Sequence, residues 1–321
     1  MTMDALDHRL LDDYQRDFPL LPRPFAAIGS QLGLTEQAVI DRLHQHRDAG
    51  RISRLGATVR PNTAAASTLA ALAVPLARLE AVAAAVGAEP GVNHAYLREG
   101  CDWNLWFVAT APDAAALAES LSRIEAATGL KVLDLRLKRA FNIDLGFALS
   151  GPRRSLGERP PADLSALQLG DRPILHALSQ GLGLTARPYA LPGLVEAHVI
   201  ARIKTLLGAQ IITRLGLILR HRALGWAANA MVVWDVPEAQ INRAGPALAA
   251  VPGVTLCYQR QVVPGWRHGL FCMIHAQSRD QAMAVLDAAR ALPDLAGVDH
   301  KVLFSTRCFV QRGAIIQGKA A

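Results

Sequence analysis

Apolar residues at the start of the chain recur with the period of a helix. Residues 5–14 carry such a face, and a second short helix is expected to begin at Arg23-Pro24-Phe25 and to end near residues 32–33. A third helix follows Thr35, whose side chain suits an N-cap. Residues 52–59 then suggest a short β-wing. This succession predicts a winged helix-turn-helix head.

After residue 60 the pattern changes to one in which strands and helices alternate. The expected strands are 69–74, 92–98, 105–110 and 132–137, and the expected helices are 79–86 and 113–127. Their order, βαββαβ, is that of a ferredoxin-like sandwich of the α+β class. The sheet of such a sandwich leaves one face free for a ligand or partner, and a second copy in the chain can pack against it.

The same order of elements then occurs a second time. The segment VIDRLHQHRDAGRISRLGATVR, residues 39–60, corresponds to VIARIKTLLGAQIITRLGLILR, residues 199–220. Further matches are Pro90-Gly91-Val92 with Pro252-Gly253-Val254, Tyr96 and Arg98 with Tyr258 and Arg260, and Arg139 and Phe141 with Arg307 and Phe309. We therefore expect two fused repeats, which form a pseudo-dimer within one chain.

The repeats divide the chain into five parts. They are a first winged helix-turn-helix at 1–60, a first ferredoxin-like sandwich at 61–149, a linker at 150–165, a second, degenerate helix-turn-helix at 166–220 and a second sandwich at 221–321. The linker, SGPRRSLGERPPADLS, is rich in Pro, Gly and charge. A helix-turn-helix joined to βαββαβ is the architecture of the Lrp/AsnC regulators, which the whole chain resembles twice over.

One repeated tripeptide has two interpretations. Arg54-Leu55-Gly56 and Arg214-Leu215-Gly216 recur with their glycines, which predicts a tight β-turn that joins each head to its sandwich. The alternative is that Arg54 or Arg214 reaches the edge of a ligand.

The composition is that of a folded, basic protein. Hydrophobic residues make up 51% of the 321 residues and charged residues 19%, which excludes intrinsic disorder. The net charge of +7 and a pI near 9.6 favour an anionic partner. Nucleic acid, a small polycarboxylate or a phosphate would each satisfy this charge.

Nothing in the chain predicts a membrane-bound or secreted protein. No apolar run reaches the roughly 18 residues that a spanning helix needs, and residues 1–9 lack the apolar core of a secretory signal. The four cysteines, Cys101, Cys257, Cys272 and Cys308, have no metal-binding spacing and are expected as reduced thiols. We expect a cytoplasmic protein without a membrane partner.

The helix-turn-helix heads argue against recognition of a DNA sequence. The first reading helix presents Glu36, and no cation, in its N-terminal turn. In the second head Pro192-Gly193 would break the positioning helix, and the reading helix again opens with an acid, Glu196. Contacts to phosphates and base edges need donors and cations at such positions.

The most specific motifs lie in the two sandwiches. They are His94-x-Tyr96-x-Arg98, DWNLWF from Asp102 to Phe107, LFCMIH from Leu270 to His275 and FSTR from Phe304 to Arg307. With them the chain resembles, over nearly its full length, the siroheme decarboxylases, specifically the fused two-half (NirDL-type) enzymes of heme d1 synthesis. The sequence departs from that pattern at His268-Gly269, where we would expect a Tyr-Asn pair.

The resemblance implies a reaction and a substrate. Siroheme loses two acetate carboxyl groups as CO2, at positions 12 and 18, and becomes 12,18-didecarboxysiroheme. The macrocycle supplies the electron sink, so the chemistry requires no further cofactor, and the iron tetrapyrrole is the substrate. Other enzymes of heme d1 biosynthesis are expected partners, and a role in alternative haem synthesis, which uses the same reaction, stays open.

Siroheme carries several carboxylates around a flat apolar macrocycle, so its pocket needs fixed cations and a hydrophobic floor. The expected carboxylate ligands stand at matching places in the two halves and are Arg98, Arg139, Arg260 and Arg307. The aromatic residues Tyr96, Trp103, Trp106 and Trp266 are either part of the floor or part of the core.

The carbon that loses CO2 needs a proton, and histidine is the usual donor near neutral pH. Our catalytic candidates are His94 and His275, each on an expected strand, with a structural role as the alternative for either. His268 is a third candidate, either as a carboxylate contact or as an axial ligand of the siroheme iron. The sequence predicts no metal site of the protein's own.

A second class of function competes with the enzyme: a DNA-binding regulator of the Lrp/AsnC type with a small effector. The acids at the start of both reading helices and Pro192-Gly193 favour the enzyme. The sequence leaves open which acetate reacts first, whether one or both pockets of the pseudo-dimer work, and the oligomeric state, a homodimer included.

Overall fold

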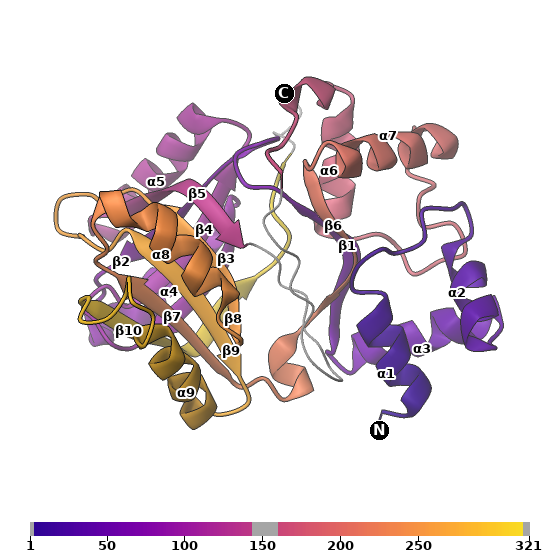
Figure 1. Ribbon diagram of the computed structural model, residues 1–321. Coiled ribbons are helices and arrows are strands. Elements are labelled where there is room, and N and C mark those ends of the chain that lie inside the picture. Colours follow the sequence, from indigo (N-terminus) through magenta and orange to yellow (C-terminus); the bar gives the residue numbers. More distant parts are fainter. Residues whose placement is uncertain (1–2, 143–159, 317–321) are drawn as a thin grey trace.

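The computed structural model describes residues 3–142 and 160–316, and it consists of two bodies side by side (Figure 1). The head, on the right of Figure 1, contains helices from both halves around a two-stranded sheet. The barrel, on the left, contains the other strands of both halves. The expected linker, residues 150–165, lies outside the described residues except for 160–165.

Both halves contribute helices and one strand to the head. The first half supplies α1 (Ala5–Asp13), α2 (Pro24–Leu32), α3 (Glu36–Asp48) and β1 (Ile52–Val59), and the second supplies the short 3-10 helix η2 (Leu164–Ala166), α6 (Asp171–Gln180), α7 (Glu196–Gly208) and β6 (Ile212–Leu219). Thr35 caps α3 as expected, because its hydroxyl accepts a hydrogen bond from the amide of Ala38 (3.1 Å). One hydrophobic core runs through both heads, from Phe25 and Val39 to Ile174 and Val199.

The second head lacks a helix between α6 and α7. Residues 181–195 form turns and bends, and Gly193, which follows Pro192, is left-handed with φ 73°. The prediction that Pro192-Gly193 breaks the positioning helix is confirmed. The segment packs on the first head, since the hydroxyl of Tyr189 donates to the carbonyl oxygen of Pro19 (2.9 Å).

The expected wing strands pair with each other rather than within one head. β1 and β6 run antiparallel, from Ile52 opposite Leu219 to Val59 opposite Ile212. Each half therefore supplies the partner strand of the other, and the two heads share one sheet.

The prediction of tight turns at Arg54-Leu55-Gly56 and Arg214-Leu215-Gly216 is wrong. Both segments lie inside strands, with Gly56 directly opposite Gly216. A Cβ on Gly56 would lie 2.2 Å from the carbonyl oxygen of Leu178, and one on Gly216 would lie 2.5 Å from that of Tyr14. These glycines are needed because backbone from another element packs closely on each, which leaves no room for a side chain.

The remaining elements form the barrel and its cover. The first half contributes β2 (Ala66–Leu72), η1 (Leu76–Arg78), α4 (Leu79–Ala88), β3 (Val92–Arg98), β4 (Leu105–Ala111), α5 (Ala114–Thr128) and β5 (Leu133–Asn142). The second contributes η3 (His221–Leu224), β7 (Ala228–Trp234), α8 (Glu238–Ala250), β8 (Val254–Arg260), β9 (Leu270–Ala276), α9 (Arg279–Arg290) and β10 (His300–Gln311). Each half shows the expected order βαββαβ, so the predicted fold class is confirmed.

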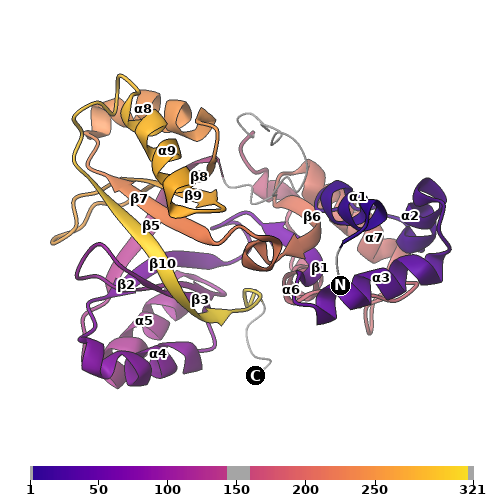
Figure 2. The same ribbon diagram turned by 90° about the horizontal axis from the view of Figure 1, so that it is seen from below.

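The two sheets join edge to edge and close into an eight-stranded barrel of order β10-β3-β4-β2-β5-β8-β9-β7. The last strand of each half pairs with the second strand of the other, β5 with β8 and β10 with β3. The free sheet faces predicted packing of one sheet on the other. Pairing at the edges also satisfies backbone groups that open edges would expose. Helices α4 and α5 cover one side of the barrel, and α8 and α9 cover the opposite side (Figure 2).

Side chains along each strand alternate between the helices and the barrel interior. In β4, Leu105 and Phe107 pack under the helices, whereas Trp106 points inward. The interior is filled by apolar side chains from both halves, among them Leu69, Leu133, Leu135, Met231, Val233, Phe271, Met273 and Leu303. This packing separates the two ends of the barrel.

Three further properties concern only the residues described above. No helix among them is long and apolar enough to span a membrane. The four cysteines are free thiols. Within the same ranges, no three or more His, Cys, Asp or Glu residues are grouped so that they could hold a metal ion.

Candidate functional site

Ionisable side chains from both halves meet at the end of the barrel that faces the head. We name them the head-side cluster: Arg54 of β1, His94, Tyr96 and Arg98 of β3, His221 and Arg222 of η3, and His275 of β9. Electrostatic contacts join Arg54 to His94 and Arg222 to both Tyr96 and Arg98. The η3 turn that carries His221 connects β6 of the head to β7 of the barrel (Figure 1).

His94 is held by stacking rather than by hydrogen bonds. Its ring lies nearly parallel to that of Tyr96, with centroids 6.3 Å apart. It forms no hydrogen bond with any residue in the described ranges. Burial, and secondly the charge of Arg54, lower the pKa of His94 to about 4. The ring is therefore neutral at neutral pH, and carboxylates of a bound anion would raise its pKa again.

Arg98 and Arg260 occupy equivalent positions on β3 and β8. One Nη of Arg98 donates to the carbonyl oxygen of Leu303 (3.1 Å), and one Nη of Arg260 donates to that of Leu135 (2.6 Å). The Nε of each is buried and has no hydrogen-bond partner in the part of the chain that is described. Burial lowers the pKa of Arg98 to about 10, so Arg98 stays charged near neutral pH, and burial also lowers the pKa of Arg260. Each can still donate to a carboxylate.

Tyr96 contributes a neutral hydroxyl to the cluster. Burial, with a smaller effect of Cys308, raises the pKa of Tyr96 to about 12. The guanidinium carbon of Arg98 lies 5.7 Å from the centroid of its ring. A neutral phenol beside this cation can donate a hydrogen bond to an anionic ligand.

His275 lies in the same cluster but is hydrogen-bonded at both ring nitrogens. The hydroxyl of Thr255 is 2.7 Å from Nδ1, and the amide nitrogen of Asn229 is 2.9 Å from Nε2. His94 and His275 thus share one end of the barrel, but their rings are held in different ways.

Sequence reasoning missed His221 and Arg222. The rings of His221 and His275 meet edge to face, with centroids 4.8 Å apart. Arg222 donates to the carbonyl oxygen of Ser305 (2.8 Å). A signal was present in the sequence: at this point the repeat breaks down, since the corresponding residues of the first half are Pro61-Asn62.

Arg139 and Arg307 lie outside the head-side cluster, on the helix side of their strands. Arg139 donates to the side-chain oxygen of Asn242 on α8 (2.8 Å), and its guanidinium lies over the ring of Phe141. Arg307 pairs with Glu80 of α4 (3.0 Å). Their predicted role in carboxylate binding remains a prediction, and they are not brought together with Arg98 and Arg260.

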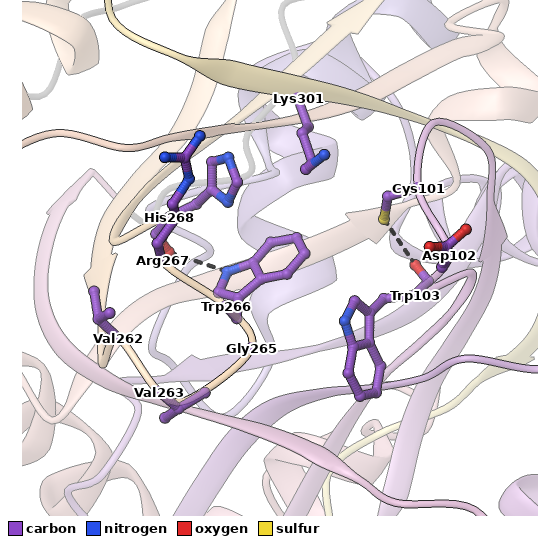
Figure 3. A pocket seen from close by; sticks show the side chains of 10 residues that line it. All are labelled: Cys101, Asp102, Trp103, Val262, Val263, Gly265, Trp266, Arg267, His268 and Lys301. Atoms are coloured by element: carbon purple, nitrogen blue, oxygen red, sulfur yellow. Dashed lines mark hydrogen bonds between the residues drawn. The ribbon is translucent and has the colours of Figure 1, made fainter.

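His268 lies at the opposite end of the barrel, in a cavity of about 460 Å³ (Figure 3). The cavity is lined by Cys101, Asp102, Trp103, Val262, Val263, Gly265, Trp266, Arg267, His268 and Lys301. His268 is 3% exposed, and neither ring nitrogen has a hydrogen-bond partner in the described part of the chain. Burial lowers its pKa. Trp106 and Trp266 contact each other with centroids 5.3 Å apart and belong to the core that separates this cavity from His94.

Arg54 is the member of the cluster that the head provides. It is largely buried in β1, and burial lowers the pKa of its guanidinium. Its Nε has no hydrogen-bond partner among the residues described. The charge of Arg54 lowers the pKa of His94, so Arg54 lies near the candidate site. Of its two interpretations, contact with a ligand therefore agrees better with the structure than a turn between head and sandwich.

One arginine of each reading helix is used inside the head. Arg42 of α3 donates to the carboxylate of Asp7 (2.7 Å), and Arg202 of α7 donates to that of Asp171 (2.7 Å). Burial alone would raise the pKa of Asp7, but hydrogen bonds from the Asp4 backbone, Arg42 and His46 lower it below its ordinary value. These pairs take up cations that DNA would require.

Fold and site together define a protein whose two AsnC-like units form one ligand-binding barrel. Residues 64–142 and 223–310 match the model of the AsnC-like ligand binding domain. Residues 7–52 match that of the siroheme decarboxylase NirDL-like HTH domain.

The relatives specify the family. The chain is 64% identical to the siroheme decarboxylase NirDL subunit of Paracoccus denitrificans over the full length of both chains. It is 28% identical to the siroheme decarboxylase of Hydrogenobacter thermophilus, with 94% of this chain and 92% of the relative covered. The chain belongs to the siroheme decarboxylase family, and within it to the fused NirDL type. These relatives favour the enzyme over the regulator.

Solved structures agree with the fold. A siroheme decarboxylase NirDL in co-complex with an iron-uroporphyrin III analogue superposes with a TM-score of 0.69 and 24% identity, covering 98% of this chain and 95% of that one. The separate NirD subunit of Stutzerimonas stutzeri is 51% identical over 47% of this chain and 99% of its own length. The separate NirL subunit of the same organism is 42% identical over 47% of this chain and 89% of its own length, so each separate subunit matches about half of this chain.

Proposed function

We propose that this chain removes the acetate carboxyl groups at C12 and C18 of siroheme as CO2 and yields 12,18-didecarboxysiroheme for heme d1 biosynthesis. Membership of the family supports the substrate, and one observation supports the site. His94, a ring without hydrogen bonds to the described residues, lies against Tyr96 and beside Arg54, and Tyr96 in turn contacts Arg98 and Arg222. A histidine beside cations is the arrangement that a proton donor for a bound polycarboxylate would need.

The arginines of the head-side cluster would bind the substrate's carboxylates. Arg54 approaches from the head, Arg222 from η3 and Arg98 from β3, so the three side chains come from different elements. Guanidinium groups bind carboxylates through paired hydrogen bonds, which fixes orientation as well as charge. Tyr96 would add a neutral donor, and the apolar barrel interior below would contact the macrocycle.

Each decarboxylation needs only electron movement within the substrate and one proton. The bond between the acetate methylene and the carboxyl carbon breaks, CO2 leaves, and the electron pair passes into the conjugated macrocycle. A protonated histidine gives its proton to the methylene carbon, which becomes a methyl group. The histidine then takes a proton from solvent, so no oxidant or reductant is consumed.

Substrate binding would prepare His94 for this step. With a pKa of about 4 the free protein holds the ring neutral. Carboxylates that bind at Arg54 would partly neutralise the charge that depresses this pKa and add negative charge nearby, so the imidazolium becomes accessible near neutral pH.

We also propose that the chain works in the cytoplasm, with other enzymes of heme d1 biosynthesis as partners. The free thiols of the four cysteines suit a reducing compartment. Both halves contribute to the head-side cluster, so the pseudo-dimer within one chain would be the working unit. Arg139 and Arg307 would then have a structural role and bind the covering helices to the outside of the barrel.

The test is anaerobic incubation of the purified chain with siroheme, followed by mass spectrometry of the tetrapyrrole. We expect the loss of two molecules of CO2 per macrocycle. A related siroheme decarboxylase assayed in parallel shows that substrate and conditions are competent. If that control reacts and siroheme stays unchanged with this chain, the proposed function is wrong.

A further inference from the structure

The hydrogen bonds around His275 define its tautomer. The hydroxyl of Thr255 contacts both Nδ1 of His275 (2.7 Å) and the carbonyl oxygen of Met273 (3.0 Å). A carbonyl oxygen can only accept, so the single hydroxyl proton goes to Met273. The hydroxyl must then accept from Nδ1–H of His275. In the neutral ring, Nε2 carries no proton and accepts from the amide of Asn229 (2.9 Å).

This arrangement leaves His275 without a proton directed at a ligand. The one proton of the neutral ring is bound to Thr255, and the other nitrogen faces Asn229. To protonate a substrate carbon, the ring would have to break a buried hydrogen bond or Asn229 would have to turn over. The prediction of His275 as a proton donor does not fit these bonds. They suit a residue that holds a neighbour in place.

That neighbour is His221. Its ring meets the ring of His275 with centroids 4.8 Å apart and an interplanar angle of 79°. His221 is partly buried at the junction of head and barrel. It is less buried than His275, which is 4% exposed, so His221 is the more accessible of the two rings.

His221 also shares the environment of His94. Each ring has an adjacent arginine, Arg222 for His221 and Arg54 for His94. Burial and these cations lower the pKa of both histidines to about 4. Carboxylates bound at either arginine would raise the pKa of the histidine beside it. Each half of the chain thus supplies one histidine that an anionic substrate would switch to its protonated form.

We propose that His221 is the second proton donor of the decarboxylation and that His275 is a positioning residue that fixes the His221 ring. The proposal rests on the proposed function. One acetate would take its proton from His94 and the other from His221. In each case a carbon–carbon bond breaks, CO2 leaves, and the imidazolium proton forms the new C–H bond.

Three variants test the assignment: His221→Gln, His275→Gln and His275→Leu. His221→Gln is expected to lower kcat by roughly 10²–10⁴-fold, the usual contribution of a positioned acid. Siroheme affinity should stay near that of the wild type, and a tetrapyrrole that has lost one CO2 should accumulate. His275→Gln keeps an amide that can accept from Asn229 but loses the ring that contacts His221, so kcat should fall by less than the roughly 100-fold that marks a lost proton donor. His275→Leu loses both hydrogen bonds and should fall further, which makes Gln the rescuing variant.

Two results would overturn the proposal. One is kcat close to wild type in His221→Gln, and the other is a loss of about 100-fold or more in folded His275→Gln. Circular dichroism checks folding, and His221→Asn provides the same measurement if His221→Gln does not fold. A wild-type chain that leaves siroheme unchanged contradicts the proposed function instead, so the two failures can be told apart.

Discussion

The two halves of the barrel repeat one frame of arginine and tyrosine. The guanidinium carbon of Arg98 lies 5.7 Å from the ring centroid of Tyr96, and that of Arg260 lies 4.6 Å from the centroid of Tyr258. Both arginines donate to a carbonyl oxygen on the last strand of a half, β10 for Arg98 and β5 for Arg260. The cationic part of the barrel interior is therefore nearly symmetric.

The histidines break this symmetry. The strand register puts Leu256 of the second half at the position of His94, and Thr110 of the first half at the position of His275. In the second half Thr255 is hydrogen-bonded to His275. The residues at the same positions in the first half are Asn93 and Thr110, and the amide of Asn93 donates to the hydroxyl of Thr110 (2.9 Å).

The difference shows what a fused chain can do that a homodimer cannot. In a homodimer every residue of the barrel end would occur twice. Here the first half supplies His94, the second supplies His221 and His275, and all face one barrel end. A single composite site of this kind suits a substrate whose two acetates occupy different positions on the macrocycle.

The largest expected effect comes from removing the first half's histidine. His94→Gln should lower kcat by roughly 10²–10⁴-fold, because a positioned proton donor is lost. Affinity for siroheme should change little, since the arginines remain. Single-turnover mass spectrometry should show a tetrapyrrole that keeps the acetate which His94 serves.

His198→Gln is the matched control, because His198 is exposed on α7 in the head. It should react like the wild type. If His94→Gln also keeps kcat within about threefold of wild type, the first half does not supply a donor and the comparison of the halves fails.

The shared sheet of the head tests whether the halves need each other to fold. Gly56→Ala puts a Cβ 2.2 Å from the carbonyl oxygen of Leu178, a backbone atom that cannot turn aside. We expect a loss of roughly 1–3 kcal/mol in the free energy of unfolding, the usual cost of overpacking. Urea denaturation measures it. Gly216→Ala should behave alike, because its Cβ would lie 2.5 Å from the carbonyl oxygen of Tyr14.

Gly208→Ala at the end of α7 is the control. Its Cβ would meet no atom within 4 Å, and alanine is the better helix former. It should be neutral or slightly stabilising. Equal stability of Gly56→Ala and Gly208→Ala would mean that close packing does not explain the glycines of the strand pair.

Local periodicity predicted the helices and strands well, because each depends mainly on neighbouring residues. Pairing across the halves was not predictable in this way. The glycine pair shows why: Gly56 suggests a turn when only its own conformational freedom is considered. Its actual constraint is Leu178, which is far away in the sequence.

The candidate site was predictable where a motif marked it, as at His94 and Arg98, and less so elsewhere. Arg139 and Arg307 share the repeat but not the head-side cluster, because register shifts between Leu137 and Arg139 and between Ser305 and Arg307 interrupt the alternation of the strands. His221 was missed because it lies where the repeat breaks down. The repeat identified the tyrosine and arginine positions that the two halves share, and the break in the repeat coincides with His221.

The interior and outer arginines should therefore differ in affinity for siroheme. Arg98→Met should weaken binding by about 5- to 150-fold, since a hydrogen bond to a charged group is lost. Arg139→Met should bind almost like the wild type, because Arg139 contacts Asn242 on the outer face. An absorbance titration measures both and should give one siroheme per chain. Equal losses for the two variants would place the outer face in the site.

The smallest expected effect is on the pH dependence of stability. The folded chain holds His94 and His221 at pKa values of about 4, against an ordinary value of 6.5. Between these values the unfolded chain binds protons that the folded chain does not. The free energy of unfolding should therefore fall as the pH is lowered from about 6.5 towards 4, by up to about 1.4 kcal/mol per pH unit for each histidine.

Urea denaturation between about pH 7 and pH 5 isolates this contribution, because most carboxylates titrate below that range. His94→Gln and His221→Gln should each flatten the slope, because each variant removes the contribution of one half. The shares should be similar, since burial and, secondly, an adjacent arginine depress the pKa of each ring to about 4. If both variants keep the wild-type slope, the rings titrate normally in the folded chain. Substrate carboxylates would then not be needed to raise the pKa of either histidine. The arginine beside each histidine would have no role in controlling its protonation.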